Sequence, residues 1–121
     1  MGADISGIVL RPSGDLDLAT VEAFRDSVQA AVAEEPDALV IDLTGVDFLD
    51  SSGLAVLALA LRAQRGRGAA CAVVNPRSIV RRAIELVGLD MLFDVAGVPP
   101  ELLVAAGGPG SSTTRLRLDP G

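Results

Sequence analysis

The sequence predicts a single α/β domain, built on a mostly parallel sheet of about four to five strands with helices packed on it. Short apolar runs alternate with stretches in which apolar residues recur every three or four positions, as strands and amphipathic helices do in turn. Gly, Pro and Asn separate these segments. The length of 121 residues suffices for one hydrophobic core. Crossovers between the parallel strands are expected to be right-handed.

The first elements follow from apolar patterns and their stop signals. Residues 7–11 predict a short strand that ends before Pro12, because proline gives a sheet ladder no N–H. A helix follows, with Asp17 or Thr20 as its cap. Residues 38–43 predict a strand buried on both faces. The helix between these strands has an apolar stripe of Val21, Phe24, Val28 and Val32.

The next elements continue the alternation. Helical periodicity begins at Leu54, and residues 69–74 predict another buried strand. Asn75 and Pro76 predict a helix start, with Asn75 as the cap and Pro76 at the first helical position. Gly88 stands where that helix needs a left-handed residue to end. The apolar sides of the two helices are formed by Leu54, Leu57, Ala58 and Leu61, and by Ile79, Val80, Ala83, Ile84 and Val87.

The C-terminal part of the chain is less regular. Residues 92–95 predict a short final strand, and residues 99–104 predict a short helix. Residues 107–114 are rich in Gly, Ser and Thr and predict a flexible linker. Residues 113–118 alternate between polar and apolar side chains, as a strand does.

The hydrophobic composition and the single cysteine limit the class of protein. The chain is 50% hydrophobic but only 2% aromatic, so the core is expected to be aliphatic, with Phe24, Phe48 and Phe93 as its only rings. Cys71 lies inside an apolar strand and is expected to be a buried, inert thiol. Neither a signal peptide nor an apolar run of membrane-spanning length is visible. We therefore expect a cytoplasmic protein with no membrane partner.

Charged residues limit the chemistry further. The absence of His excludes Ser-His-Asp and Cys-His catalysis and histidine metal sites, so we expect no catalytic residue, no metal and no cofactor. A net charge of −6 argues against direct nucleic-acid binding. Between Ser51 and Arg82 there are arginines but no acids, which predicts either a solvated face or a docking patch for an acidic partner. These arginines are Arg62, Arg65, Arg67, Arg77, Arg81 and Arg82.

The most informative run is residues 39–54, in which a buried strand leads to Asp50-Ser51-Ser52-Gly53 and then to a helix. Asp50, Ser51 and Ser52 are all candidates for the N-cap of that helix. The run resembles the signature of the STAS domain, and most closely that of the small bacterial anti-sigma-factor antagonists, in which D-S-[ST]-G-L follows a central strand. Upstream, Gly14-Asp15-Leu16-Asp17 with Thr20 resembles the family's G-E-L-D-x-x-T segment.

The resemblance covers residues 8–95 and implies a STAS-like domain over residues 1–106, followed by a linker and tail over residues 107–121. The family usually has an antiparallel strand before the first parallel one, and only residues 1–6 are available for such a short edge strand here. The C-terminal alternating segment is then either a mobile tail or an added strand on the sheet edge left bare by the short N-terminus.

The resemblance also implies a function and a site. In this family the unphosphorylated protein binds an anti-sigma-factor serine kinase and so releases a sigma factor for transcription. The kinase, which brings ATP and magnesium, phosphorylates the first serine of the motif, here Ser51, and a serine phosphatase restores the binding form. Ser52 is the second candidate acceptor, although backbone capping suits it better. The implied partner-binding residues are Asp17, Asp50, Ser51, Ser52, Gly53 and Leu54.

A phosphate on Ser51 has a predictable physical effect. The free N–H groups of a helix N-terminus favour an anion, typically by about 0.3–1 kcal/mol, so the fold should tolerate phosphorylation. The phosphate adds about −1.5 to −2 charge beside Asp17, Asp47 and Asp50. A partner that covers this helix end with an acidic or apolar surface would be repelled or forced to desolvate the dianion. Affinity would then change with little change in shape.

Other interpretations of the site remain open. Asp50 is either the helix cap or a group that positions the incoming hydroxyl. Gly53 could let a kinase approach the backbone closely. Asp17 could simply cap the first helix, and Asp42, inside a buried strand, is expected to be a hydrogen-bonded structural residue. Arg81 and Arg82 lie too far along the chain from the serines to be placed in the site.

Two other functional classes compete with the antagonist. The first is a STAS scaffold or stress-signalling module that binds a partner or small ligand without a phospho-switch, although no Walker loop or dinucleotide fingerprint is present. The second is an enzyme with Ser51 as nucleophile. That class lacks a Gly-x-Ser-x-Gly elbow and any His or Lys to act as a base, so we do not expect an enzyme.

Overall fold

The computed structural model describes residues 4–107 and 113–119. Its centre is a four-stranded sheet in the order β5-β3-β1-β6. Three of the strands run parallel, namely β1 (Ile5–Leu10), β3 (Ala38–Asp42) and β5 (Ala70–Val74). All five residues of β3 are buried, as expected for a strand with neighbours on both sides and helices on both faces. The prediction of a mostly parallel α/β sheet is confirmed.

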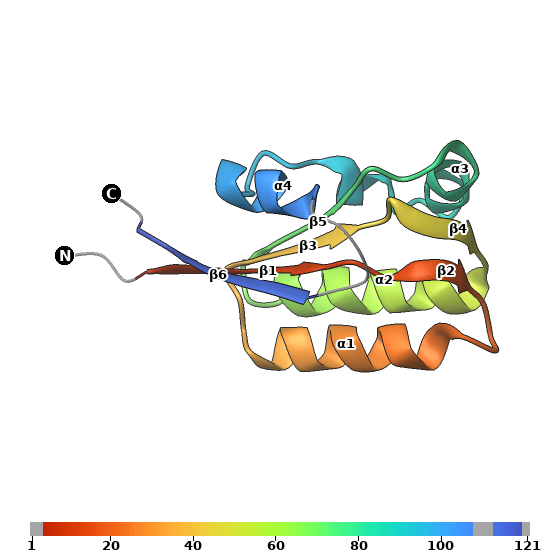
Figure 1. Ribbon diagram of the computed structural model, residues 1–121, viewed down its shortest axis with the longest axis horizontal. Helices are drawn as coiled ribbons and strands as arrows, with labels where there is room; N and C mark the ends of the chain where they lie inside the picture. The colour runs from red at the N-terminus through yellow and green to blue at the C-terminus, as the bar shows by residue number, and fades with distance from the viewer. Residues whose placement is uncertain (1–3, 108–112, 120–121) are drawn as a thin grey trace.

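A second, two-stranded sheet lies at one end of the first (Figure 1). It pairs β2 (Ser13–Leu16) with β4 (Gly45–Leu49) in parallel, so that Leu16 lies opposite Leu49. Each of these short strands follows directly on a strand of the main sheet, because β1 leads to β2 and β3 leads to β4. The sequence did not predict strands in these two segments, which precede Asp17 and Asp50, and the structure shows that they form a small sheet.

The helices cover both faces of the main sheet. Helices α1 (Val21–Ala33) and α2 (Ser51–Arg65) pack side by side on one face, and α4 (Pro100–Ala106) packs on the other against β1 and β3 (Figure 1). Helix α3 (Ser78–Leu86) lies beside β4 and is followed by the 3₁₀ turn η1 (Asp90–Phe93). No helix within residues 4–107 and 113–119 has the length and apolar character needed to cross a membrane.

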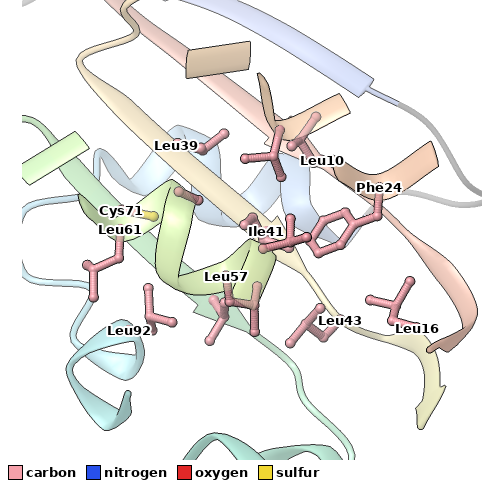
Figure 2. Close-up of a cluster of buried hydrophobic side chains, with 14 of the residues drawn as sticks. Leu10, Leu16, Phe24, Leu39, Ile41, Leu43, Leu57, Leu61, Cys71 and Leu92 are labelled. Carbon is pink, nitrogen blue, oxygen red and sulfur yellow. The ribbon is translucent and has the colours of Figure 1, made fainter. Parts of the chain in front are cut away.

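The larger hydrophobic cluster lies between the sheet and helices α1 and α2 (Figure 2). It is aliphatic, with Phe24 as its buried ring and Phe93 packed against it from the side. Phe48 was predicted to belong to this core, and that prediction is wrong: its side chain is 43% exposed. Cys71 is buried as expected, and desolvation raises the pKa of its thiol to about 12, so this thiol stays protonated and inert.

Two further local predictions are wrong. Residues 92–95 do not form a strand, because η1 turns directly after α3 and brings Leu92, which is fully buried, into the larger cluster. Asn75 does not cap a helix. Its backbone φ is +57°, its side chain donates to Asp42 Oδ1 at 3.4 Å, and α3 begins only at Ser78. A local sequence pattern contains neither of these tertiary contacts.

The antiparallel edge strand comes from the C-terminus. Strand β6 (Thr113–Leu118) pairs with β1 so that Ile5 lies opposite Leu118 and Leu10 opposite Thr113. An N-terminal edge strand is not seen from residue 4 onward, where β1 itself begins at Ile5. Of the predicted linker, residues 108–112 lie outside the described residues. Of the two alternatives for the tail, the structure therefore has the strand.

An exposed ion pair also holds β6. Arg115 donates to both carboxylate oxygens of Glu34, the C-cap residue of α1, with its Nη2 2.7 Å from Oε2. This hydrogen bonding lowers the pKa of Glu34. The tail strand is thus fixed to the corner where α1 leads into β3.

Helix α4 packs so closely on β1 that Gly7 is required there. A Cβ built on Gly7 would lie 2.4 Å from Cδ1 of Leu102, a fully buried residue of α4. We expect Gly7→Ala to lower the free energy of unfolding by about 1–2 kcal/mol, because the leucine side chain must shift within a packed interface. Denaturant unfolding measures this change. If stability is unchanged, the close contact between α4 and β1 is not as described.

Candidate functional site

The predicted motifs meet where strands β2 and β4 end side by side. Leu16 and Leu49 are paired, and the N–H of Asp50 donates to the carbonyl of Leu16 at 3.2 Å. Asp17 and Asp50 are therefore the first residues after two neighbouring strands, and Ser51 is the first residue of α2. Two segments more than 30 residues apart in sequence form one surface.

Asp50 is the N-cap of α2. Its Oδ1 accepts hydrogen bonds from the backbone N–H of Ser52 at 2.8 Å and of Gly53 at 3.4 Å, and its carbonyl accepts from Leu54 N–H at 3.0 Å. The two bonds to Oδ1 satisfy N–H groups that have no partner within the helix, and the bond from Leu54 is the first of the helix itself. Of the three candidate caps, the structure therefore selects Asp50. The Ser51 side chain is left exposed at the first helical position, and Ser52 is half-buried.

Gly53 has an internal role that the sequence did not reveal. A Cβ at this position would lie 2.4 Å from Cδ1 of Leu49 and 2.9 Å from the backbone oxygen of Leu16. The residue is buried, so its closeness to β2 is sufficient to explain why glycine is needed here. Leu54, the next residue, is half-buried and packs against the larger core. Both residues therefore pack the start of α2 against the rest of the domain.

Asp17 and Thr20 fix the turn between β2 and α1. Asp17 Oδ1 accepts from the N–H of Ala19 at 2.9 Å and of Thr20 at 3.1 Å. In return, the N–H of Asp17 donates to Thr20 Oγ1 at 3.1 Å. The N-cap position of α1 belongs to Thr20, which makes no side-chain capping bond to the helix. The Asp-x-x-Thr motif is therefore a closed hydrogen-bonded turn that holds the loop rigid beside Ser51.

Further charged residues lie on this part of the surface, and of these Arg77 was not expected here from the sequence. Asp15 and Asp47 are exposed, and Arg77 Nε lies 3.7 Å from Asp47 Oδ1 and donates to the carbonyl of Thr44 at 3.3 Å. The other members of the arginine group are exposed as well, consistent with a solvated face. No local sequence signal links Arg77 to β4, because the contact depends on the packing of α3 against that strand.

Two large apolar side chains are exposed on this part of the surface. Leu18, in the turn after Asp17, is 79% exposed, and Phe48, opposite Asp15 in the small sheet, is 43% exposed. The β2–β4 register shifts between Gly14 and Asp15, and along β4 the alternation of buried and exposed residues breaks at Phe48. An irregularity of this kind reorients a side chain in a way that periodicity does not predict.

A groove of about 320 Å³ runs between β2 and the start of α1. Its apolar wall includes Leu10, Leu16 and Phe24, and Asp15 and Thr20 are among its polar groups. No cluster of three or more His, Cys, Asp or Glu side chains suited to a metal ion occurs in the described part of the chain. Asp42, which accepts from Thr44 Oγ1 at 2.6 Å, is a buried structural residue, as expected.

The capping bond of Asp50 has a measurable consequence. We expect Asp50→Ala to lower the free energy of unfolding by about 1 kcal/mol, because two N–H groups of α2 lose their acceptor. Asp50→Asn keeps an acceptor oxygen and should retain most of that stability. Thermal or denaturant unfolding of the two variants separates loss of the cap from loss of charge. Equal destabilisation by both would show that the charge matters more than the hydrogen bonds.

The fold and this capped serine-bearing helix end define the class of protein, and comparison with known proteins agrees. The STAS-domain family model matches residues 3–101, and the chain belongs to this family. It is 44% identical over 92 residues to the anti-sigma-F factor antagonist RsfB of Mycobacterium tuberculosis, covering 75% of each chain. It is 32% identical over 92 residues to RsfA of the same organism, covering 74% of this chain and 72% of RsfA.

Solved structures show the same architecture. An anti-sigma factor antagonist from Mycobacterium paratuberculosis superimposes with a TM-score of 0.68 at 37% identity, covering 83% of this chain and 85% of that one. The unphosphorylated form of the antagonist SpoIIAA superimposes with a TM-score of 0.66 at 22% identity, covering 86% and 91%. The predicted STAS-like fold is confirmed.

Proposed function

We propose that this chain is an anti-sigma-factor antagonist whose binding is controlled by phosphorylation of Ser51. The unphosphorylated form binds an anti-sigma-factor serine kinase, and this binding releases a sigma factor for transcription. Phosphorylation of Ser51 by that kinase ends the complex, and a serine phosphatase restores the binding form. The names of the relatives support the first part of this cycle, since RsfB and RsfA are both called anti-sigma-F factor antagonists.

The observation that carries the proposal is the position of Ser51. Its side chain is exposed at the first residue of α2, while the neighbouring Asp50 supplies the cap through its own carboxylate. The hydroxyl can therefore be modified without removing a hydrogen bond on which the helix start depends. Ser52 is half-buried, and its N–H is one of those held by Asp50, so it is the less suitable acceptor.

The surroundings of Ser51 explain why a phosphate would act on binding. The helix N-terminus stabilises an anion by about 0.3–1 kcal/mol, so α2 tolerates the added charge. Asp17, Asp47 and Asp50 already place carboxylates on this end of the molecule. A protein surface that covers Ser51 would have to remove water from a phosphate with about −1.5 to −2 charge, and that desolvation opposes the complex.

Phosphorylation in vitro tests the proposal. The chain is incubated with candidate anti-sigma-factor kinases and ATP, and the phosphate is mapped by mass spectrometry. We expect one phosphate on Ser51 in the wild type and in Ser52→Ala, and none in Ser51→Ala. Ser52→Ala is the matched control, since it removes the adjacent hydroxyl of the same helix turn. A phosphate outside residues 50–53, or label that persists in Ser51→Ala, would contradict the proposal.

The groove between β2 and α1 favours a second candidate function, a STAS module that binds a small ligand. Its volume of about 320 Å³ lies at the low end of the range for small-molecule sites. Calorimetry with ATP and GTP tests this function for nucleotides. Ser27 lines this groove. Binding that is lost in Ser27→Leu would support the function, and the absence of heat would count against it.

A further inference from the structure

We propose that Leu18 and Phe48 are the apolar anchors of the partner interface, and that the kinase presents to them an apolar hollow bordered by basic side chains. This inference rests on the proposed function and adds to it the chemistry of the contact. The motif residues do not themselves supply such a contact, since Gly53 is buried and Leu54 packs against the core.

Both anchors are placed by the strands that place Ser51. Leu18 follows Asp17 directly, in the turn that leaves β2, and Phe48 is two residues before the Asp50 cap. Because Asp15 pairs with Phe48 and Leu16 with Leu49, the two segments are in register across the small sheet. Leu16 and Leu49 are buried, whereas Asp15 and Phe48 are exposed. Leu16 and Leu49 thus face the core, whereas Asp15 and Phe48 face solvent.

The backbone that carries both side chains is fixed by hydrogen bonds. The Leu18 turn is closed by the hydrogen bonds between Asp17 and Thr20, and the backbone around Phe48 is fixed by strand pairing. An apolar side chain on an ordered backbone costs less conformational entropy on binding than one on a mobile loop, because the backbone is already in place. Aromatic side chains are also enriched at the cores of protein interfaces.

Charge around the anchors selects the kind of partner. Asp15 and Asp47 are exposed, Asp17 is half-buried, and Asp47 forms an ion pair with Arg77. An acidic partner surface would be repelled by these carboxylates, whereas basic side chains facing Asp15 and Asp47 would be attracted. The basic side chains of the kinase would then lie at the border of the interface. Its apolar centre would cover the start of α2, where a phosphate on Ser51 would lose its water.

Alanine substitution measures the anchors directly. The affinity of the kinase that phosphorylates the wild-type chain is measured by calorimetry for Leu18→Ala and Phe48→Ala. We expect each variant to lose about tenfold or more in affinity. Val104→Ala is the matched control, because Val104 is 80% exposed on α4, at the opposite end of the molecule from the small sheet (Figure 1). The affinity of the Val104→Ala variant for the kinase should stay within about twofold of that of the wild type.

Folding and charge are controlled separately. Thermal unfolding shows whether Phe48→Ala is folded, and Phe48→Leu keeps an apolar side chain and should recover part of the lost affinity. Asp15→Asn should weaken binding several-fold at low salt, with the difference shrinking as salt rises, while Glu101→Gln, an exposed charge on α4, should not.

The outcomes distinguish this inference from the proposed function. Suppose that the wild type binds its kinase and is phosphorylated on Ser51, but Leu18→Ala and Phe48→Ala bind that kinase as tightly as the wild type does. The assignment of Leu18 and Phe48 as anchors is then wrong, whereas the proposed function is unaffected. Stronger binding of Asp15→Asn would show that the partner surface is acidic and would overturn its stated chemistry. If no anti-sigma-factor kinase binds the wild type, the proposed function itself fails.

Discussion

Replacing Ser51 with aspartate is expected to lower the affinity for the anti-sigma-factor kinase by about 100-fold, or about 2.7 kcal/mol. The physical reason is that a carboxylate at the exposed start of α2 must lose its water when the partner covers this surface, and neighbouring carboxylates give it no compensation. Ser51→Ala removes only a hydroxyl and should bind within a few-fold of wild type. Calorimetric titration of the purified kinase compares these variants.

Ser51→Asn is the matched control for this prediction, because asparagine has the size of aspartate without its charge. We expect Ser51→Asn to bind far more tightly than Ser51→Asp. Equal loss of affinity in the two variants would show that bulk at this position, and not charge, separates the partners. Circular dichroism should be the same for all of these variants, because the Asp50 cap is untouched. In thermal unfolding Ser51→Asp should be slightly more stable than the others, because the helix N-terminus favours an anion by about 0.3–1 kcal/mol.

The substitution Gly53→Ala is expected to have the largest effect on stability. The new methyl group would lie 2.4 Å from Cδ1 of Leu49 and 2.9 Å from the backbone oxygen of Leu16, so α2 or β2 must move. Alanine is a better helix former than glycine by about 1 kcal/mol, which offsets part of the strain. We expect a net decrease of about 2 kcal/mol in the free energy of unfolding, together with weaker kinase binding. Denaturant unfolding measures the first effect and calorimetry the second.

Gly97→Ala is a suitable control for this substitution. Its Cβ would lie 3.6 Å from Cβ of Ala70, which is an ordinary contact, so the stability should be unchanged or slightly higher. If Gly53→Ala were as stable as wild type, the close packing of α2 on β2 would be contradicted. The support that holds Ser51 in position would then need another explanation.

Much of the fold could be predicted because apolar periodicity and capping chemistry act locally. The buried strand β3, the stripe of α1 and the helix after Ser51 are all encoded within their own segments. The resemblance of two short motifs to a known family added their spatial relation, which places Asp17 beside Asp50. Exposure of Ser51 at the helix start follows from the same local pattern once Asp50 is the cap.

The remaining features depend on contacts between distant segments. Phe48 is exposed because the β2–β4 pairing is irregular, and Arg77 reaches Asp47 because α3 packs on β4. Leu92 packs into the core in a 3₁₀ turn, although its local pattern is that of a strand. The need for glycine at position 53 arises in part from Leu16 on another strand, and no local sequence pattern contains that contact.

The most direct test of the account uses one protein sample in three states. The chain is titrated against its kinase before phosphorylation, after complete phosphorylation of Ser51, and again after treatment with a serine phosphatase, and a two-dimensional NMR spectrum is recorded for each state. We expect affinity to be lost and then recovered, with chemical shifts changing only around the ends of β2 and β4 and the start of α2. Unchanged affinity after full phosphorylation, or a spectrum altered throughout the core, would contradict the claim that charge at this helix end controls association and not the fold.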